Sequence, residues 1–160
     1  MIRPDIQFLR GVAVLLVVFY HAKFPLFKAG YLGVDVFFVL SGFLITGLIM
    51  KGIQAETFTF SGFYLRRAKR LLPAAYTTFF ITLCLAFTTL TSSELWGFYD
   101  QLIGAVTFTG NMVLWRQGTY FGIESELKPL LHTWSLAVEE QYYLIVPAIM
   151  VLTPRIYWLR

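Results

Sequence analysis

Ionisable residues lie within or beside stretches that are apolar and long enough to cross a membrane. Arg10 and His21 flank the apolar run "GVAVLLVVFY". Asp35 stands near the start of a second apolar stretch, and Glu139 with Glu140 stands inside "TWSLAVEEQYYLIVPAIMVL". Charged groups are costly in a bilayer, so each of these residues is a candidate for function.

The spacing of Arg10 and His21 places both on one face of a helix. Eleven residues are close to three helical turns, and the two side chains then stand about 16 Å apart along the axis. A shared face favours a line of polar groups over two separate interfacial side chains. Asp35 is expected near the depth of His21, where a carboxylate can fix the tautomer of a histidine. It could equally be an interfacial carboxylate that favours a helix N-terminus, and the residues leave both readings open.

The adjacent glutamates of the last apolar stretch are expected to differ in role. On a helix, Glu139 and Glu140 point about 100° apart. Glu140 and Gln141 are expected to hold neighbouring helices together, as polar side chains do in membrane bundles. Glu139 is expected near the outer face, at the depth of His21.

A basic cluster, "FYLRRAKRLLP", precedes another apolar stretch. On a helix Arg66 and Arg70 lie one turn apart, with Arg67 beside them. Guanidinium groups grip phosphates bidentately, so this cluster could bind a phosphorylated ligand. Basic residues here could also set membrane topology and contact anionic lipids, and charge alone favours that second reading.

The elements that carry these residues are expected to be membrane helices. Charged residues make up 14% of the 160 residues and hydrophobic residues 58%, whereas soluble domains carry about a quarter charged residues. A span needs about 20 mostly apolar residues. The predicted fold is therefore an all-α polytopic transmembrane bundle with about four spans, at 5–24, 31–50, 71–90 and 133–152. Residues 102–115 are apolar but only 14 residues long, which favours a re-entrant or interfacial segment over a full span. If this segment crossed instead, Arg155 and Arg160 would lie outside.

Lys and Arg in short loops predict the orientation. The basic loop 51–70 is expected to be cytoplasmic, and with it the N-terminus. The last span then runs inward and ends at Arg155 and Arg160. The only cysteine, Cys84, lies among apolar residues and is expected to be an inert thiol.

Four motifs together resemble the membrane acyltransferase 3 family, the O-acetylases of bacterial cell-surface glycans. They are "FLRGVAVLLVVFYHA" with Arg10 and His21, "GVDVFFVLSGFLI" from Gly33, "RRAKRLLP" with Arg67 and Arg70, and "LLHTWSLAVEEQYYLIVP" from Leu130. The fourth is similar to the subgroup of lipopolysaccharide O-antigen acetylases. On this resemblance, 1–160 is the N-terminal part of a membrane acyltransferase domain.

The resemblance implies an acyltransferase that uses acyl-CoA, usually acetyl-CoA, as donor substrate and a sugar hydroxyl of a cell-surface polysaccharide or lipopolysaccharide as acceptor. Arg67 and Arg70 would hold the coenzyme A phosphates, with Arg66 assisting. Arg10 would line the route through the membrane, and His21 would be the catalytic base. Asp35 or Glu139 would orient His21, and the choice between them stays open.

The resemblance also implies a multi-pass protein of the bacterial inner membrane, in contact with membrane lipids. No metal, permanently bound cofactor or nucleic acid is expected. The family's remaining C-terminal spans, and the SGNH-type outer domain of some members, are missing from the sequence, so we expect the chain to be truncated and inactive alone. The alternative is a transporter or channel subunit in which Arg10, His21, Asp35 and Glu139 form an intramembrane relay.

Overall fold

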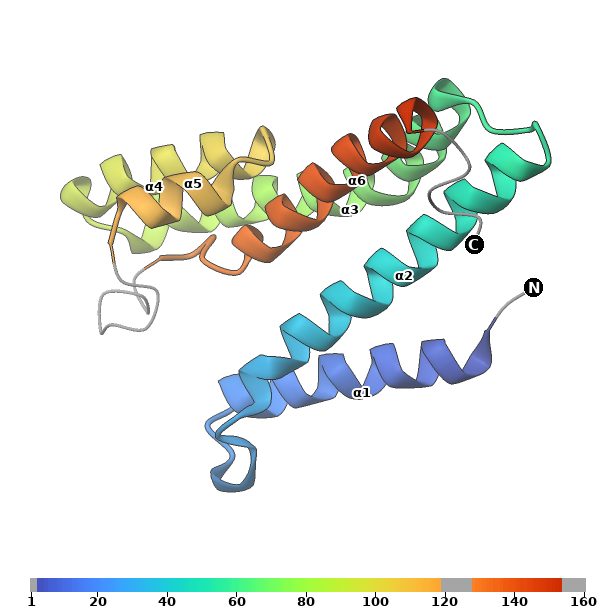
Figure 1. Cartoon of the computed structure of the whole chain (residues 1–160). Coiled ribbons are helices and arrows are strands. Elements are labelled where there is room, and N and C mark those ends of the chain that lie inside the picture. Colours follow the sequence, from blue (N-terminus) through green and yellow to red (C-terminus); the bar gives the residue numbers. More distant parts are fainter. Residues whose placement is uncertain (1–2, 119–127, 154–160) are drawn as a thin grey trace. The chain divides into compact units, whose positions relative to one another are not determined.

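The computed structural model describes residues 3–118 and 128–153, which form helices and contain no strand (Figure 1). Four helices are long and apolar enough to cross a membrane: Pro4–His21, Gly30–Gln54, Phe60–Thr89 and Thr133–Leu152. The predicted all-α class is therefore confirmed, and a long apolar helix overlaps each of the four predicted spans. Arg155 and Arg160, on which the orientation of the last span relied, lie outside the described residues.

The chain divides into two compact units. Among the described residues, the first comprises 3–55 together with 150–153, and the second comprises 56–118 and 128–149.

The first unit is a helical hairpin of α1 (Pro4–His21) and α2 (Gly33–Gln54), joined by two short 3-10 turns. Pro4 opens α1, where its missing N–H removes no helical hydrogen bond. Gly33 lets the start of α2 approach α1 closely, because a Cβ there would collide with the carbonyl oxygen of Ala13 and with Val17. The end of α1 and the start of α2 therefore lie together.

The second unit is built on α3 (Phe60–Thr89), a helix of 30 residues. Its first half lies beside α6 (Thr133–Leu152), where the Tyr64 hydroxyl donates to the Leu144 carbonyl. Its second half lies beside α4 (Ser92–Val106), as Figure 1 shows. The core there is formed by buried Ala75, Phe79, Ala86, Phe98, Ala105 and Leu130. Helices α6 and α4 therefore lie beside successive halves of α3.

The basic segment predicted as a loop at 51–70 is largely helical. Helix α2 continues to Gln54 and α3 begins at Phe60, eleven residues before the predicted span. The intervening Leu, Arg, Ala and Lys residues are good helix formers, which hydropathy does not detect. Pro73 lies inside α3 and does not end it. Membrane helices tolerate proline where neighbouring groups satisfy the freed backbone.

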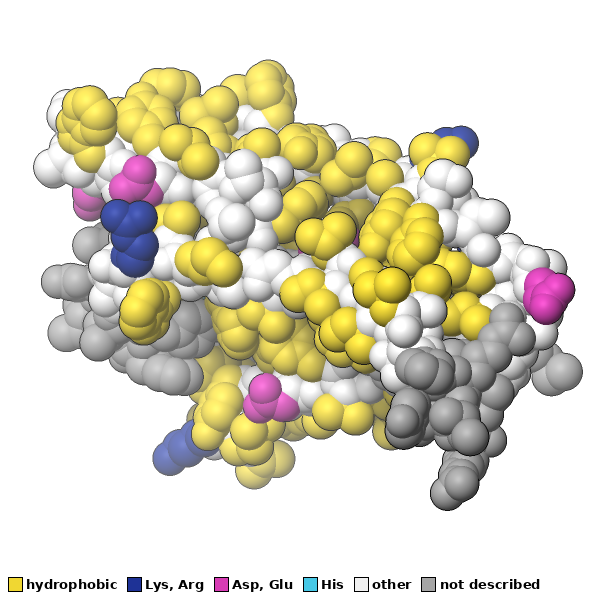
Figure 2. All heavy atoms as spheres, turned by 45° about the horizontal axis from the view of Figure 1, so that its top comes forward, with side chains coloured by type: hydrophobic (Ala, Val, Ile, Leu, Met, Phe, Trp, Pro, Cys, Tyr) yellow, Lys and Arg dark blue, Asp and Glu magenta, His cyan; other side chains and the backbone are white. Residues whose placement is uncertain are grey.

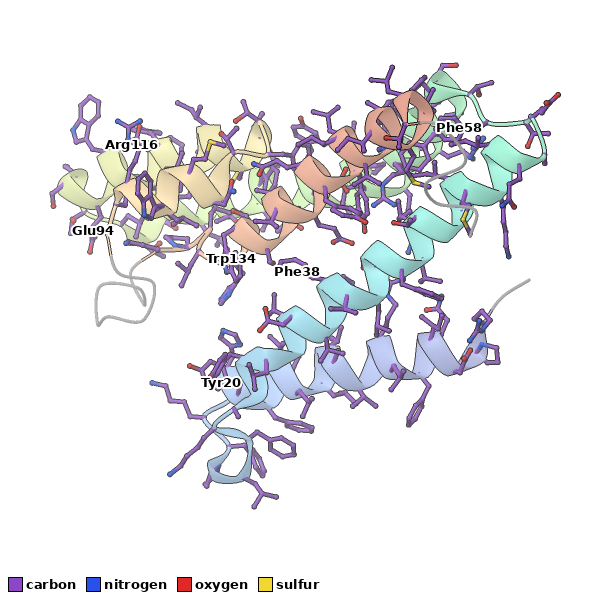
Figure 3. All side chains as sticks on the ribbon, in the orientation of Figure 1. Tyr20, Phe38, Phe58, Glu94, Arg116 and Trp134 are labelled. Atoms are coloured by element: carbon purple, nitrogen blue, oxygen red, sulfur yellow. The ribbon has the colours of Figure 1, made fainter. Side chains whose placement is uncertain are left out.

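The segment 102–115 is divided between α4 and α5 (Gly110–Arg116), with a turn at residues 107–109. Phe108 has a positive φ of 55° in this turn. Glu94 and Arg116 lie at the same end of the α4–α5 pair, so the two helices run antiparallel (Figure 3). Neither α4 nor α5 is long enough to be among the candidate spans.

Large apolar side chains remain exposed along the long helices. Phe8 and Val39 are each 71% exposed, and Phe80 and Leu144 are 66% and 64% exposed. Hydrophobic side chains cover most of the face in Figure 2, with few charged groups among them. Such a surface is the one expected of helices that face lipid or further helices.

Candidate functional site

His21 is the last residue of α1 and is exposed. Its Nδ1 lies 2.8 Å from the carbonyl oxygen of Val17, one turn earlier. A carbonyl oxygen only accepts hydrogen bonds, so Nδ1 carries the proton in this contact. In the neutral ring the lone pair is then on Nε2, which is the nitrogen that can take a proton from a substrate.

Asp35 lies in the first turn of α2, at the same end of the hairpin as His21. The sequence left open whether Asp35 or Glu139 orients His21. The Val17 carbonyl accepts a hydrogen bond from Nδ1 and so selects the tautomer. A role of Asp35 in orienting the ring stays a prediction. Glu139 belongs to the other unit, and its relation to His21 stays a prediction.

Arg10 is part-buried on α1, and its guanidinium lies 4.6 Å from the ring centroid of Phe37 on α2. Such a cation–π contact lowers the cost of holding an arginine among apolar helices. Arg10 is thereby directed against α2, within the first unit. Its proposed place along a route through the membrane stays a prediction.

The second unit brings Arg67 of α3 together with both glutamates of α6. Arg67 Nη2 lies 3.2 Å from Glu140 Oε1, and both side chains are largely buried. The Arg67 guanidinium lies 3.4 Å from the ring centroid of Tyr143. The Tyr143 hydroxyl donates to Glu139 Oε1. We call Arg67, Glu139, Glu140 and Tyr143 the Arg67 cluster.

This ion pair is incompatible with the depths expected from the sequence. Arg67 was expected in a cytoplasmic loop, and Glu139 near the outer face. About 30 Å of hydrocarbon separates those levels, yet Arg67 touches the residue next to Glu139. The basic segment and the two glutamates therefore share one level, because α6 packs beside the first half of α3.

Arg66 and Arg70 differ from Arg67, because both are exposed. They are four residues apart within α3, so they project from neighbouring turns of one face. Arg66 also lies beside Gly62, where a side chain would meet its guanidinium. Of the three arginines predicted to bind phosphate, Arg66 and Arg70 are therefore the two that are exposed.

Polar side chains of α6 also join the α4–α5 turn. Asn111 and Gln141 exchange two amide hydrogen bonds, of 3.1 and 2.9 Å. Gln141 also donates to the carbonyl of Phe108 at 2.9 Å. The predicted roles of Glu140 and Gln141 in holding helices together are confirmed. The sequence did not predict their partners. The charge of Arg67 and the amide of Asn111 made these residues possible partners, but nothing in the sequence places them beside α6.

The fold and these contacts define a helical, multi-pass membrane protein with ionisable side chains inside its helix packing. The acyltransferase-domain family matches residues 3–160, and the chain belongs to this family.

Three relatives illustrate the similarity. A Bacillus subtilis (strain 168) protein, named as a putative peptidoglycan O-acetyltransferase, is 37% identical over 151 residues, covering 92% of this chain and 24% of the relative. A Staphylococcus aureus (strain COL) protein, named as a putative O-acetyltransferase, is 35% identical over 149 residues, with the same coverage of 92% and 24%. An uncharacterized Haemophilus influenzae protein is 41% identical over 118 residues, covering 74% of this chain and 48% of the relative.

The chain thus spans about a quarter to a half of the length of these relatives. No solved structure matches it.

Proposed function

We propose that the complete gene product containing this chain is a membrane O-acyltransferase. It transfers an acyl group, typically acetyl, from acyl-CoA to a sugar hydroxyl of a bacterial cell-surface glycan. Membership of the acyltransferase-domain family supports this proposal and favours it over a transporter or channel subunit. The observation that carries it is the hydrogen bond of His21 Nδ1 to the Val17 carbonyl, which leaves Nε2 as the basic nitrogen.

The reaction needs a base because a sugar hydroxyl is a weak nucleophile at neutral pH. His21 Nε2 takes the hydroxyl proton as the oxygen forms a bond to the acyl carbon. The C–S bond of the thioester breaks, and the proton passes to the leaving sulfur. The products are an ester and free coenzyme A, so atoms and charge balance without a further reactant.

The remaining predicted residues have supporting roles in this proposal. Arg66 and Arg70 are exposed cations that suit the phosphates of the donor. Asp35 lies at the His21 end of the first unit, where a carboxylate stabilises the imidazolium formed during transfer. We place the protein in the cytoplasmic membrane, with its N-terminus and basic cluster on the side where acyl-CoA is found.

Replacement of His21 tests the proposal. In the complete gene product, His21→Gln should reduce O-acetylation about 100-fold or more, since general-base catalysis contributes about 10²–10⁴-fold. The measurement is the release of base-labile acetate, made separately from purified peptidoglycan and from lipopolysaccharide or other surface glycans. The material whose acetate content falls in the His21→Gln variant identifies the class of acceptor.

Lys28→Gln is the matched control, because Lys28 is an exposed cation of the α1–α2 connection. It should leave both membrane insertion and acetylation unchanged. Full acetylation by a normally inserted His21→Gln variant would remove His21 from the catalytic role.

A further inference from the structure

The guanidinium of Arg67 is contacted on more than one side by other residues of the Arg67 cluster. One terminal nitrogen bonds Glu140, and the ring of Tyr143 covers one face of the group. The Nε atom is buried without a hydrogen-bond partner among the described residues. Tyr143 itself is only 3% exposed.

These contacts make Arg67 a poor ligand for a phosphate. A phosphate bonded to this guanidinium would lie close to the carboxylate of Glu140, 3.2 Å from the shared nitrogen. Like charges this close repel, and the repulsion is strong in a part-buried site. Breaking the pair instead would leave Glu140 without its partner, which is costly at low exposure.

The cluster also links Arg67 to Glu139. The guanidinium stacks on the Tyr143 ring, and the Tyr143 hydroxyl donates to Glu139. A tyrosine fixed by a stacked cation can hold a carboxylate in one orientation. Arg67 therefore acts on Glu139 through Tyr143, while the bond to Glu140 ties α3 to α6.

We propose that Arg67 is a positioning residue that fixes Glu139 through Tyr143, and that the donor's phosphates are bound by Arg66 and Arg70 instead. The inference rests on the proposed function, because it divides roles within the same site. It also changes the role that the family resemblance implied for Arg67.

Steady-state kinetics of the purified complete gene product separate the two roles. Arg70→Gln should raise the KM for acetyl-CoA about tenfold or more, as expected for the loss of a charge-assisted hydrogen bond. Arg67→Gln should lower kcat about tenfold or more and change that KM less than about twofold. An equal rise in KM for both variants would overturn the proposal.

Tyr143→Phe isolates the link to Glu139. Phenylalanine keeps the stacked ring under Arg67 but removes the hydroxyl that bonds Glu139. We expect a loss in kcat similar to that of Arg67→Gln, with an unchanged KM for acetyl-CoA and a smaller fall in the thermal midpoint in detergent than Arg67→Gln causes. A wild-type kcat for Tyr143→Phe would show that the link has no role in the reaction.

A charge exchange tests the ion pair without relying on catalysis. Arg67→Glu and Glu140→Arg should each lower the thermal midpoint, and the double variant should recover most of the loss. Arg70→Glu combined with Glu140→Arg is the matched control and should not recover. Independent effects of Arg67→Glu and Glu140→Arg would contradict the pairing.

The proposed function and the positioning role of Arg67 can fail separately. If the wild-type product transfers no acyl group from acyl-CoA, the proposed function fails, while the thermal coupling still tests the ion pair. If transfer occurs and Arg67→Gln mainly raises the donor KM, the proposed function stands and the positioning role fails.

Discussion

At the scale of single residues, backbone carbonyls orient two polar side chains, those of His21 and Gln141. The Val17 carbonyl fixes the protonated nitrogen of His21. The Phe108 carbonyl accepts a hydrogen bond from Gln141 and lies in a turn with positive φ. In both cases a backbone group that the sequence does not display sets the orientation of a polar side chain.

The amide pair of Asn111 and Gln141 should contribute to stability. We expect Asn111→Ala and Gln141→Ala to show a coupling of roughly 0.6 kcal/mol and at most about 1.7 kcal/mol in a double-mutant cycle, the average and the maximum found for hydrogen bonds between membrane helices. The measurement is reversible unfolding in detergent micelles. Additive effects would mean that the two amides do not stabilise each other.

At the scale of elements, α3 and the α4–α5 pair show how charge and capping shape the second unit. Helix α3 runs through the basic cluster and Pro73 without a break. Helix α4 begins at a capping arrangement in which the Thr91 backbone N–H and hydroxyl both donate to Glu94. These hydrogen bonds lower the pKa of Glu94 from its ordinary value.

The cap of α4 should therefore weaken in acid. A folded-state pKa below the unfolded one means that the stabilisation is complete above the unfolded value of about 4.3. It is lost as pH falls through the lower folded value. Hydrogen exchange of the first turn of α4 should accelerate over that window relative to the intrinsic rate.

The control for this prediction is Glu94→Gln, which removes the titrating group. Its first turn should exchange faster than wild type at neutral pH and show no further weakening in acid. An identical acid response in the variant would assign the effect to another residue.

At the scale of the whole molecule, the exposed apolar surface and the four long helices indicate a membrane protein whose helices face lipid or further helices. The Arg67–Glu140 pair adds a constraint on depth. Any membrane position assigned to α6 also assigns one to the basic part of α3, because the ion pair fixes their relative level.

Reporter fusions test the predicted orientation in the complete gene product. An alkaline phosphatase fusion after Arg116 should be active, because a last span that runs inward requires the preceding chain around Arg116 to lie outside. A fusion after Ala55 should be inactive in the same reporter and active with a cytoplasmic one. A cytoplasmic signal after Arg116 would show that residues 102–115 lie on a segment that crosses.

Hydropathy and periodicity were sufficient to predict the helical class and the long membrane helices, because apolar length is a property of local sequence. The range of α6, 133–152, was predicted at its observed bounds. The start of α3 was not, since a charged helix such as the one around Arg66 has no hydropathy signal. The interhelical roles of Glu140 and Gln141 followed from the cost of burying polar groups.

Only the tertiary structure decided which partners those polar groups have. Periodicity places Arg67 and Glu140 on faces of their own helices, but it does not give the stagger of one helix along another. That stagger depends on packing between segments more than 70 residues apart, such as Tyr64 on Leu144. It brings Arg67, an arginine expected to bind phosphate, to the carboxylate of Glu140.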